Sequence, residues 1–237
     1  MIYSRDQLMK KKAHTHAKAM IDFSSIVIEY VTFYLVFTCI KNKSQNVKTG
    51  DVYQTYLIDK ERISEKSVFG AGCETCPIVS DCYVTRDKLT VRKQLKNALE
   101  GKGKYKFMSL DDACKYLTKK TLRFGSYGDP SFIPLSDIEK ITQACESWLG
   151  YTHYWREIPT QYSKYFMASV EDKASKLLAN SLGYRTFEVF FDDVINIDND
   201  SILCPNFTHS IQCANCGLCN GKKGDSDKRK NICIPSH

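Results

Sequence analysis

The chain has 237 residues, of which 43% are hydrophobic and 26% charged, a balance typical of a globular protein and not of a disordered or fibrous chain. The formal net charge of +7 lies at the two ends: residues 1–20 hold five cations and one acid, and residues 222–230 hold five cations and two acids. The stretch between these ends is neutral overall. Basic ends are typical either of a solvated surface or of contact with nucleic acid.

The first segments predict a basic arm followed by β structure. Residues 1–22 form the arm or a basic helix. The apolar stretch FSSIVIEYVTFYLVFTCI, residues 23–40, is near the lower length limit for a membrane span. It contains Glu29 and is rich in β-branched and aromatic residues, which favours buried strands and no membrane contact. The apolar run starts too late for a signal peptide, so we expect a cytoplasmic protein of a microbe or of a virus-infected cell.

Strands and helices then alternate along the chain. A strand at 51–58 precedes a glycine-flanked loop at 70–82, and helices are expected at 84–103 and 109–120. The clearest pattern follows, with strands at 121–127, 151–155, 165–170 and 184–191 and helices at 137–149 and 171–182. Ser136 and Glu139 are spaced as a capping box for the first of these two helices.

This alternation predicts parallel strands with right-handed crossovers. The expected fold class is α/β, a parallel and partly closed β/α barrel over residues 23–203, followed by a Cys-rich, metal-binding extension over residues 204–237. An open doubly wound sheet is the alternative. In both folds, chemistry gathers where strands end. The polar and aromatic residues at those ends are Gly128, Asp129, His153, Trp155, Ser169, Glu171 and Cys204.

Eleven cysteines in a cytoplasmic chain favour metal ligands over disulfides. The first group is Cys73-x2-Cys76-x5-Cys82, which suits an iron–sulfur cluster with one open iron or three of four zinc ligands. The second group comprises Cys204, Cys213, Cys216, Cys219, Cys233 and His237. Its Cys-x2-Cys-x2-Cys run is ferredoxin-like, whereas Cys216, Cys219, Cys233 and His237 have zinc-finger-like spacing, so spacing leaves both metals open.

A cysteine loop after an early strand, followed by RFGSYGDPSFIP and a helix, resembles the radical S-adenosylmethionine enzymes, particularly the small barrel proteins of this type found in phages. The resemblance implies a [4Fe–4S] cluster on Cys73, Cys76 and Cys82 and an auxiliary cluster in the tail. It also implies that the GDP turn contacts S-adenosylmethionine, with Asp129 as the acid that accepts hydrogen bonds from its ammonium group. The first cysteine motif departs from the usual Cys-x3-Cys-x2-Cys of that family.

The resemblance further implies cofactor contacts by Ser126, Gly128, Asp129 and Ser169, a catalytic role for Asp129, and substrate contacts by Arg123, His153 and Trp155. The expected substrate is a nucleotide or a nucleic acid. Two alternatives stay open. The cysteine-rich tail is also similar to the zinc site of tRNA-guanine transglycosylases, in which Asp129 would be the nucleophile. The second alternative is a non-enzymatic, zinc-stabilised module that binds nucleic acid through loop 222–230 and some of its 14 tyrosines.

Overall fold

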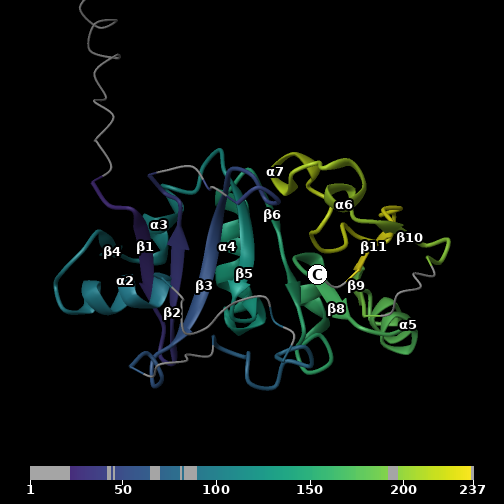
Figure 1. Ribbon diagram of the computed structural model, residues 1–237, viewed down its shortest axis with the longest axis horizontal. Coiled ribbons are helices and arrows are strands. Elements are labelled where there is room, and N and C mark those ends of the chain that lie inside the picture. The colour runs from purple at the N-terminus through teal and green to yellow at the C-terminus, as the bar shows by residue number, and fades with distance from the viewer. Residues whose placement is uncertain are drawn as a thin grey trace, which may run out of the picture.

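The computed structural model describes residues 22–41, 44, 46–64, 70–80, 82, 90–191 and 197–235 (Figure 1). The predicted basic arm therefore lies outside the described residues, apart from Asp22, and so does His237. The chain is an α/β protein with two mostly parallel sheets. Within the described ranges, no helix is long and apolar enough to cross a membrane.

The first sheet has six strands in the order β4-β1-β2-β3-β5-β6. These are β1 Ser25–Glu29, β2 Phe33–Thr38, β3 Val52–Asp59, β4 Tyr105–Phe107, β5 Thr121–Tyr127 and β6 Ser147–Leu149. The pairs β1–β2 and β2–β3 are antiparallel, and the pairs β1–β4, β3–β5 and β5–β6 are parallel. The apolar stretch 23–40, predicted as buried β structure, is therefore a hairpin of the two strands β1 and β2.

The second sheet has five parallel strands in the order β10-β11-β9-β8-β7. These are β7 Tyr151–Thr152, β8 Met167–Val170, β9 Thr186–Phe190, β10 Ser201–Leu203 and β11 Asn231–Pro235. Gly150 joins the two sheets, because β6 ends just before it, β7 begins just after it, and its carbonyl accepts a 3.1 Å hydrogen bond from the Met167 amide. Among the described strands, β4 and β10 are edges that do not pair with each other, so no closed barrel forms.

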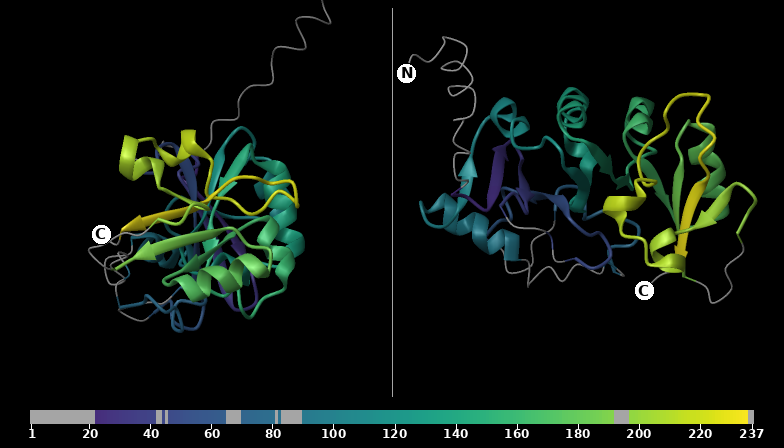
Figure 2. Two further views of the ribbon diagram at one scale, coloured as in Figure 1. Left: turned by 90° about the vertical axis from the view of Figure 1, so that its right-hand side faces the viewer. Right: turned by 90° about the horizontal axis from the view of Figure 1, so that it is seen from above.

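Helices cover both faces of these sheets. They are α2 Thr90–Leu99, α3 Leu110–Cys114, α4 Leu135–Ala144, α5 Lys173–Ser181, α6 Pro205–His209 and α7 Cys213–Cys216, with short 3-10 turns η2 Pro130–Phe132 and η3 Thr160–Lys164. Helices α4 and α5 lie along the same side of the two sheets (Figure 2). The α5 helix begins at Asp172, whose carboxylate accepts a 2.8 Å hydrogen bond from the Ser175 amide.

The main core lies between the first sheet and the helices α3 and α4. Leu35, Leu57 and Phe124 of the sheet are buried against Ile138 and Ile141 of α4. A smaller cluster on the opposite face lies under Leu95 of α2. The sheet is therefore buried on both faces where β1, β2 and β3 cross it, which explains why these strands are almost continuously apolar.

Four predicted elements need correction. The helix expected at 109–120 covers only Leu110–Cys114. The helix expected at 137–149 ends at Ala144, because Ser147–Leu149 pairs with β5 as strand β6. Ser136 lies inside α4, whose N-cap is Pro134 without a side-chain cap, so the predicted capping box is wrong. The strand expected at 151–155 covers only Tyr151–Thr152.

Candidate metal centre

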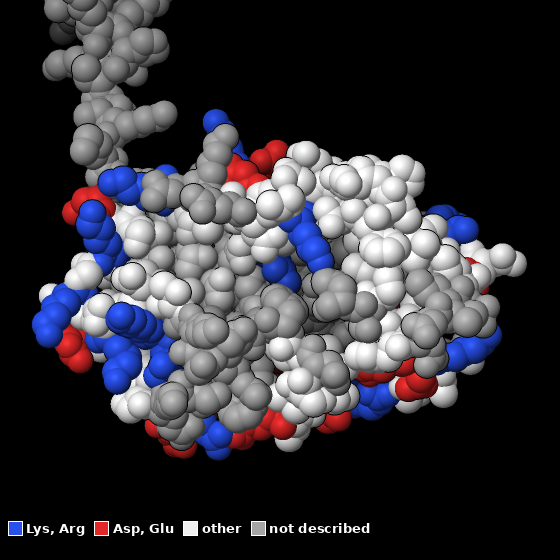
Figure 3. Space-filling view, viewed as in Figure 1, with Lys and Arg blue, Asp and Glu red and all other residues white. Residues whose placement is uncertain are grey.

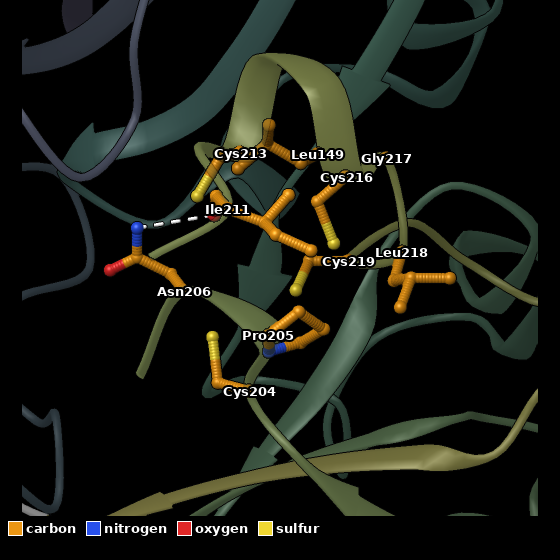
Figure 4. A pocket seen from close by; sticks show the side chains of 10 residues that line it. All are labelled: Leu149, Cys204, Pro205, Asn206, Ile211, Cys213, Cys216, Gly217, Leu218 and Cys219. Atoms are coloured by element: carbon orange, nitrogen blue, oxygen red, sulfur yellow. Dashed lines mark hydrogen bonds between the residues drawn. The ribbon is translucent and has the colours of Figure 1, made fainter. Parts of the chain in front are cut away.

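Four cysteines of the C-terminal extension line one cavity. Cys204 follows β10, Cys213 and Cys216 are the first and last residues of α7, and Cys219 lies three residues further on. Their side chains line a small space of about 10 Å³ (Figure 4), which is about the room that one water molecule needs. Apolar side chains of Leu149, Ile211 and Leu218 complete the wall.

Backbone hydrogen bonds hold this segment against both sheets. The amides of Cys213 and Ala214 donate to the carbonyls of Lys48 and Thr49, just before β3, at 3.1 and 2.9 Å. The Cys219 carbonyl accepts from the Gly150 amide at 2.8 Å, and the Cys204 amide donates to the Cys233 carbonyl at 2.9 Å. The thiols are thus brought together by tertiary contacts at three separate places in the fold.

The α7 helix is a single turn, and it ends at Gly217 with a positive φ of 64°. This left-handed conformation is favoured by glycine, and it reverses the chain so that Cys219 faces the same cavity as Cys216 (Figure 4). The three cysteines of the Cys-x2-Cys-x2-Cys run therefore line one cavity because a helical turn is followed by a glycine.

The thiols influence each other electrostatically. Burial raises the pKa of the Cys219 thiol, and Cys213, Cys204 and Cys216 raise it further. Burial also raises the pKa of Cys213, whereas the nearby Arg123 guanidinium lowers it. Four thiols that oppose each other's ionisation are ordinarily neutral, and a bound cation reverses that preference because it stabilises the thiolates.

The other residues predicted for this site lie elsewhere. The Cys233 thiol is buried in β11, donates to the Ile202 carbonyl at 3.2 Å, and does not line the cavity. His237 lies outside the described residues. Within the described ranges, no group of three or more His, Cys, Asp or Glu side chains converges on a position that could hold a metal ion.

Arg185, which the sequence analysis did not single out, holds the cysteine-bearing loop. It is 4% exposed, and its guanidinium donates to the carbonyls of Leu218, Asn220 and Lys230 at 2.7, 2.9 and 2.6 Å. An arginine at the start of the strand region YRTFEVFF is the sequence feature that could have indicated this role.

The first cysteine loop lies on the turn that follows β5. The Ala71 amide donates to Leu57 of β3 at 3.1 Å, and the Ala71 carbonyl accepts from the Asp129 amide at 2.8 Å. A Cβ on Gly70 would lie 2.6 Å from the Gly128 backbone, so only glycine permits this close approach. Burial raises the pKa of Cys73 to about 12, the Gly128 amide opposes that rise, and the nearby Cys76 and Cys82 add to it. Cys82 is exposed.

The Asp129 carboxylate is buried and saturated with donors. One oxygen accepts from the Ser131 amide at 3.0 Å, the Ser131 hydroxyl at 2.7 Å and the Thr152 hydroxyl at 2.8 Å. The other accepts from the His153 amide at 2.8 Å. This geometry suits an organising residue that joins the ends of β5 and β7, and it leaves little acceptor capacity for a ligand.

His153 lies between the first cysteine loop and Glu171. Its Nδ1 is 3.5 Å from the Glu171 carboxylate. Burial lowers the pKa of His153, but the nearby Cys76 and Glu171 outweigh burial and raise it to about 10. Four of the seven strand-end residues therefore lie together, with Gly128, Asp129, His153 and Glu171 close to Cys73 and Cys76.

The remaining predicted contacts are buried in the fold. Trp155 is 1% exposed, and its indole donates to the Ser169 carbonyl at 2.9 Å, so it packs in the core around α5. Ser126 and Ser169 are buried. Arg123 is also buried, on the side of β5 that faces Cys213. No protein-family model, no curated protein and no solved structure matches the chain, so the residues and their geometry alone carry the functional argument.

Proposed function

We propose that the protein is a metal protein whose C-terminal extension binds an iron–sulfur cluster through Cys204, Cys213, Cys216 and Cys219. The observation that carries the proposal is the shared cavity: the thiols of Cys204 and of the run Cys213–Cys219 line one space (Figure 4). Four cysteine thiolates are the usual ligand set of [2Fe–2S] and [4Fe–4S] clusters.

Four cysteine ligands suit two kinds of metal centre. A single zinc ion is bound tetrahedrally by thiolates at about 2.3 Å, and [2Fe–2S] and [4Fe–4S] clusters are also held by four thiolates. We favour the cluster because the run Cys213-x2-Cys216-x2-Cys219 is of the ferredoxin type.

Two buried cations support an anionic centre. Arg123 and Arg185 are both less than one-tenth exposed, and they are electrostatic neighbours of Cys213 and Cys219, respectively. Burial and, to a smaller extent, the nearby Arg229 lower the pKa of Arg185 to about 10. Four thiolates around a cluster of charge +2 carry a net charge of −2, so two guanidiniums would balance the centre.

A second site of radical S-adenosylmethionine type, on a partly closed barrel, is our proposal for the first cysteine loop. Its support is positional: β3 and β5 are parallel neighbours, and the loop after β3 lies on the Gly128–Asp129 turn after β5. A cluster and cofactor bound there would supply hydrogen-atom abstraction. In this proposal Asp129 keeps its hydrogen bonds and holds the turn, while the Gly128 amide faces Cys73.

The same geometry gives less support to the alternative based on base exchange. Both oxygens of the buried Asp129 carboxylate already accept hydrogen bonds, three on one and one on the other, so attack on a ribose carbon would have to compete with at least one of them. The zinc-finger-like alternative needs Cys233, whose thiol lies in β11 and outside the cavity.

Anaerobic reconstitution with iron and sulfide tests the proposal. We expect brown protein with cluster absorbance, and Cys219→Ser should lose about four iron atoms per chain if the cluster is of the [4Fe–4S] type. Cys145→Ser is the matched control, because that thiol is half-buried in another part of the chain and contacts the Thr142 carbonyl at 3.6 Å. Cys73→Ser separates the two sites, since it should remove only iron bound at the first loop. Colourless protein that holds stoichiometric zinc would refute the cluster.

A further inference from the structure

The C-terminal extension contains a long run without charged residues. Residues 204–221 include no Asp, Glu, Lys or Arg, although 26% of the whole chain is charged. This run forms α6, α7 and most of the wall of the four-cysteine cavity. The surface over α6 and α7 is accordingly almost free of charged side chains (Figure 3). The extension thus presents an uncharged surface in a chain whose net charge is +7.

Three large apolar side chains are exposed on this surface. Phe207 of α6 is 57% exposed, and Ile211, shortly after α6, is 42% exposed. Val47, in the connection between β2 and β3, is 82% exposed. The Gln212 side chain donates to the Val47 carbonyl at 3.1 Å, and the Asn206 side chain donates to the Ile211 carbonyl at 3.1 Å. These bonds hold Val47 beside the other two residues, and we call Val47, Phe207 and Ile211 together the extension face.

The extension face is more than a scatter of single apolar residues. Isolated exposed apolar side chains are ordinary on a protein surface, but neighbouring ones within an uncharged surround are typical of an interaction site. Ile211 also lines the four-cysteine cavity, so part of the wall of that cavity is itself exposed to solvent. A partner on this face would therefore cover the cavity wall as well as Phe207.

Charge favours a second copy of the chain as that partner. Two copies that each carry a net charge of +7 repel each other unless they meet where like charges do not face one another. A twofold dimer brings the same surface patch of each copy together, so that patch has to be complementary to itself. An uncharged apolar face satisfies this condition. The interfaces of homodimers are also more apolar than those of other complexes, and aromatic residues are enriched in them.

We infer that two copies of this chain associate through the extension face, with Phe207 as an aromatic anchor of the interface. The interface covers the exposed side of Ile211 in both copies, so association shields the four-cysteine cavity. The inference needs no bound metal, because the extension face is formed by side chains outside the cavity and by Ile211 at its wall.

Sedimentation velocity of the full chain over a series of concentrations tests this inference. We expect a dimer whose dissociation constant lies in the micromolar range. Phe207→Ser should raise that constant at least tenfold, because buried aromatic anchors contribute most to the affinity of an interface. Val47→Ser, on a separate segment of the chain, should weaken the dimer in the same direction, which keeps the test independent of the folding of α6. A higher KCl concentration should not weaken the dimer, since charges on the two faces do not hold it together.

Leu177→Ser is the matched control. Leu177 is 59% exposed, close to the value for Phe207, but it lies on α5 and outside the extension face. This variant should dimerise as wild type does. The inference is overturned if Leu177→Ser and Phe207→Ser weaken the dimer equally. It is also overturned if wild type stays monomeric at about 0.1 mM, and binding of that monomer to phosphatidylcholine vesicles would assign the face to a membrane instead.

The dimer and the metal centre can fail separately. The Cys219 thiol faces the cavity and is not part of the extension face (Figure 4). Cys219→Ser should therefore lose metal and still form the dimer, whereas Phe207→Ser should lose the dimer and still bind metal. A chain that dimerises without binding iron would refute the cluster and leave the extension face as inferred.

Discussion

Replacing Asp129 with Asn distinguishes an organising carboxylate from a reactive one. The wild-type carboxylate accepts four hydrogen bonds, three on one oxygen and one on the other. Asn keeps only one acceptor oxygen. If that oxygen takes the place that contacts Ser131 and Thr152, the new NH2 group faces the His153 N–H, and two donors oppose each other.

The magnitude follows from this count. One charge-assisted hydrogen bond is worth about 1.5–3 kcal/mol, and the three that remain lose their charge assistance. We therefore expect Asp129→Asn to lower the free energy of unfolding by about 3 kcal/mol. For a chain of this size, that loss lowers Tm by about 6–12 °C. Urea unfolding followed by circular dichroism measures the change.

Asp172→Asn is the matched control. Like Asp129, Asp172 accepts hydrogen bonds from both the amide and the hydroxyl of a following serine. The Ser175 amide donates at 2.8 Å and the Ser175 hydroxyl at 2.7 Å, but Asp172 is exposed. Asn is as good an N-cap as Asp, so the expected change is below about 0.5 kcal/mol. If Asp129→Asn is as stable as Asp172→Asn, the organising role assigned to Asp129 is wrong.

Three further predictions concern the extension and α5. Arg185→Gln should speed release of the proposed metal to a chelator at least tenfold relative to wild type. The reason is that three carbonyls of the cysteine-bearing segment lose their donor. Equal release rates for the two proteins would contradict this. Lys176→Met should cost about 3 kcal/mol in urea unfolding, because Lys176 is 1% exposed beside several carboxylates, whereas Lys173→Met, at 70% exposure, should cost under about 0.5 kcal/mol. Hydrogen bonds from Arg229 hold the pKa of Asp227 well below its ordinary value. The contribution of Asp227 to stability is therefore complete above about pH 4 and is lost as the pH falls further. Asp227→Asn should flatten the acid limb of a plot of Tm against pH.

Local patterns predicted the parallel half of the fold well. The strand TLRFGSY and the helix within EDKASKLLANSL are present, because hydrophobic periodicity and an N-cap coincide there with tertiary packing. The antiparallel hairpin of β1 and β2 was not predicted, since an almost continuous apolar run does not reveal where the chain reverses. Pairing also decided the end of α4, because SWL extends the sheet as β6 instead of adding a helical turn.

The candidate site was predictable in its residue types and not in its partners. Cysteine spacing identified Cys204, Cys213, Cys216 and Cys219, all of which line the cavity. Spacing alone also included Cys233, which belongs to a strand. The contribution of Arg185 depends on carbonyl groups more than 30 residues away, and such backbone contacts leave no pattern in a sequence.

The place of β11 has a consequence for biosynthesis. This strand lies between β9 and β10, and β10 pairs with no other described strand. During translation, the segment from Ser201 to Cys219 leaves the ribosome before the strand that anchors it exists. We therefore expect the proposed metal centre to mature only after residues 231–235 have emerged, so that a ribosome stalled before them would carry an open sheet with unprotected thiols.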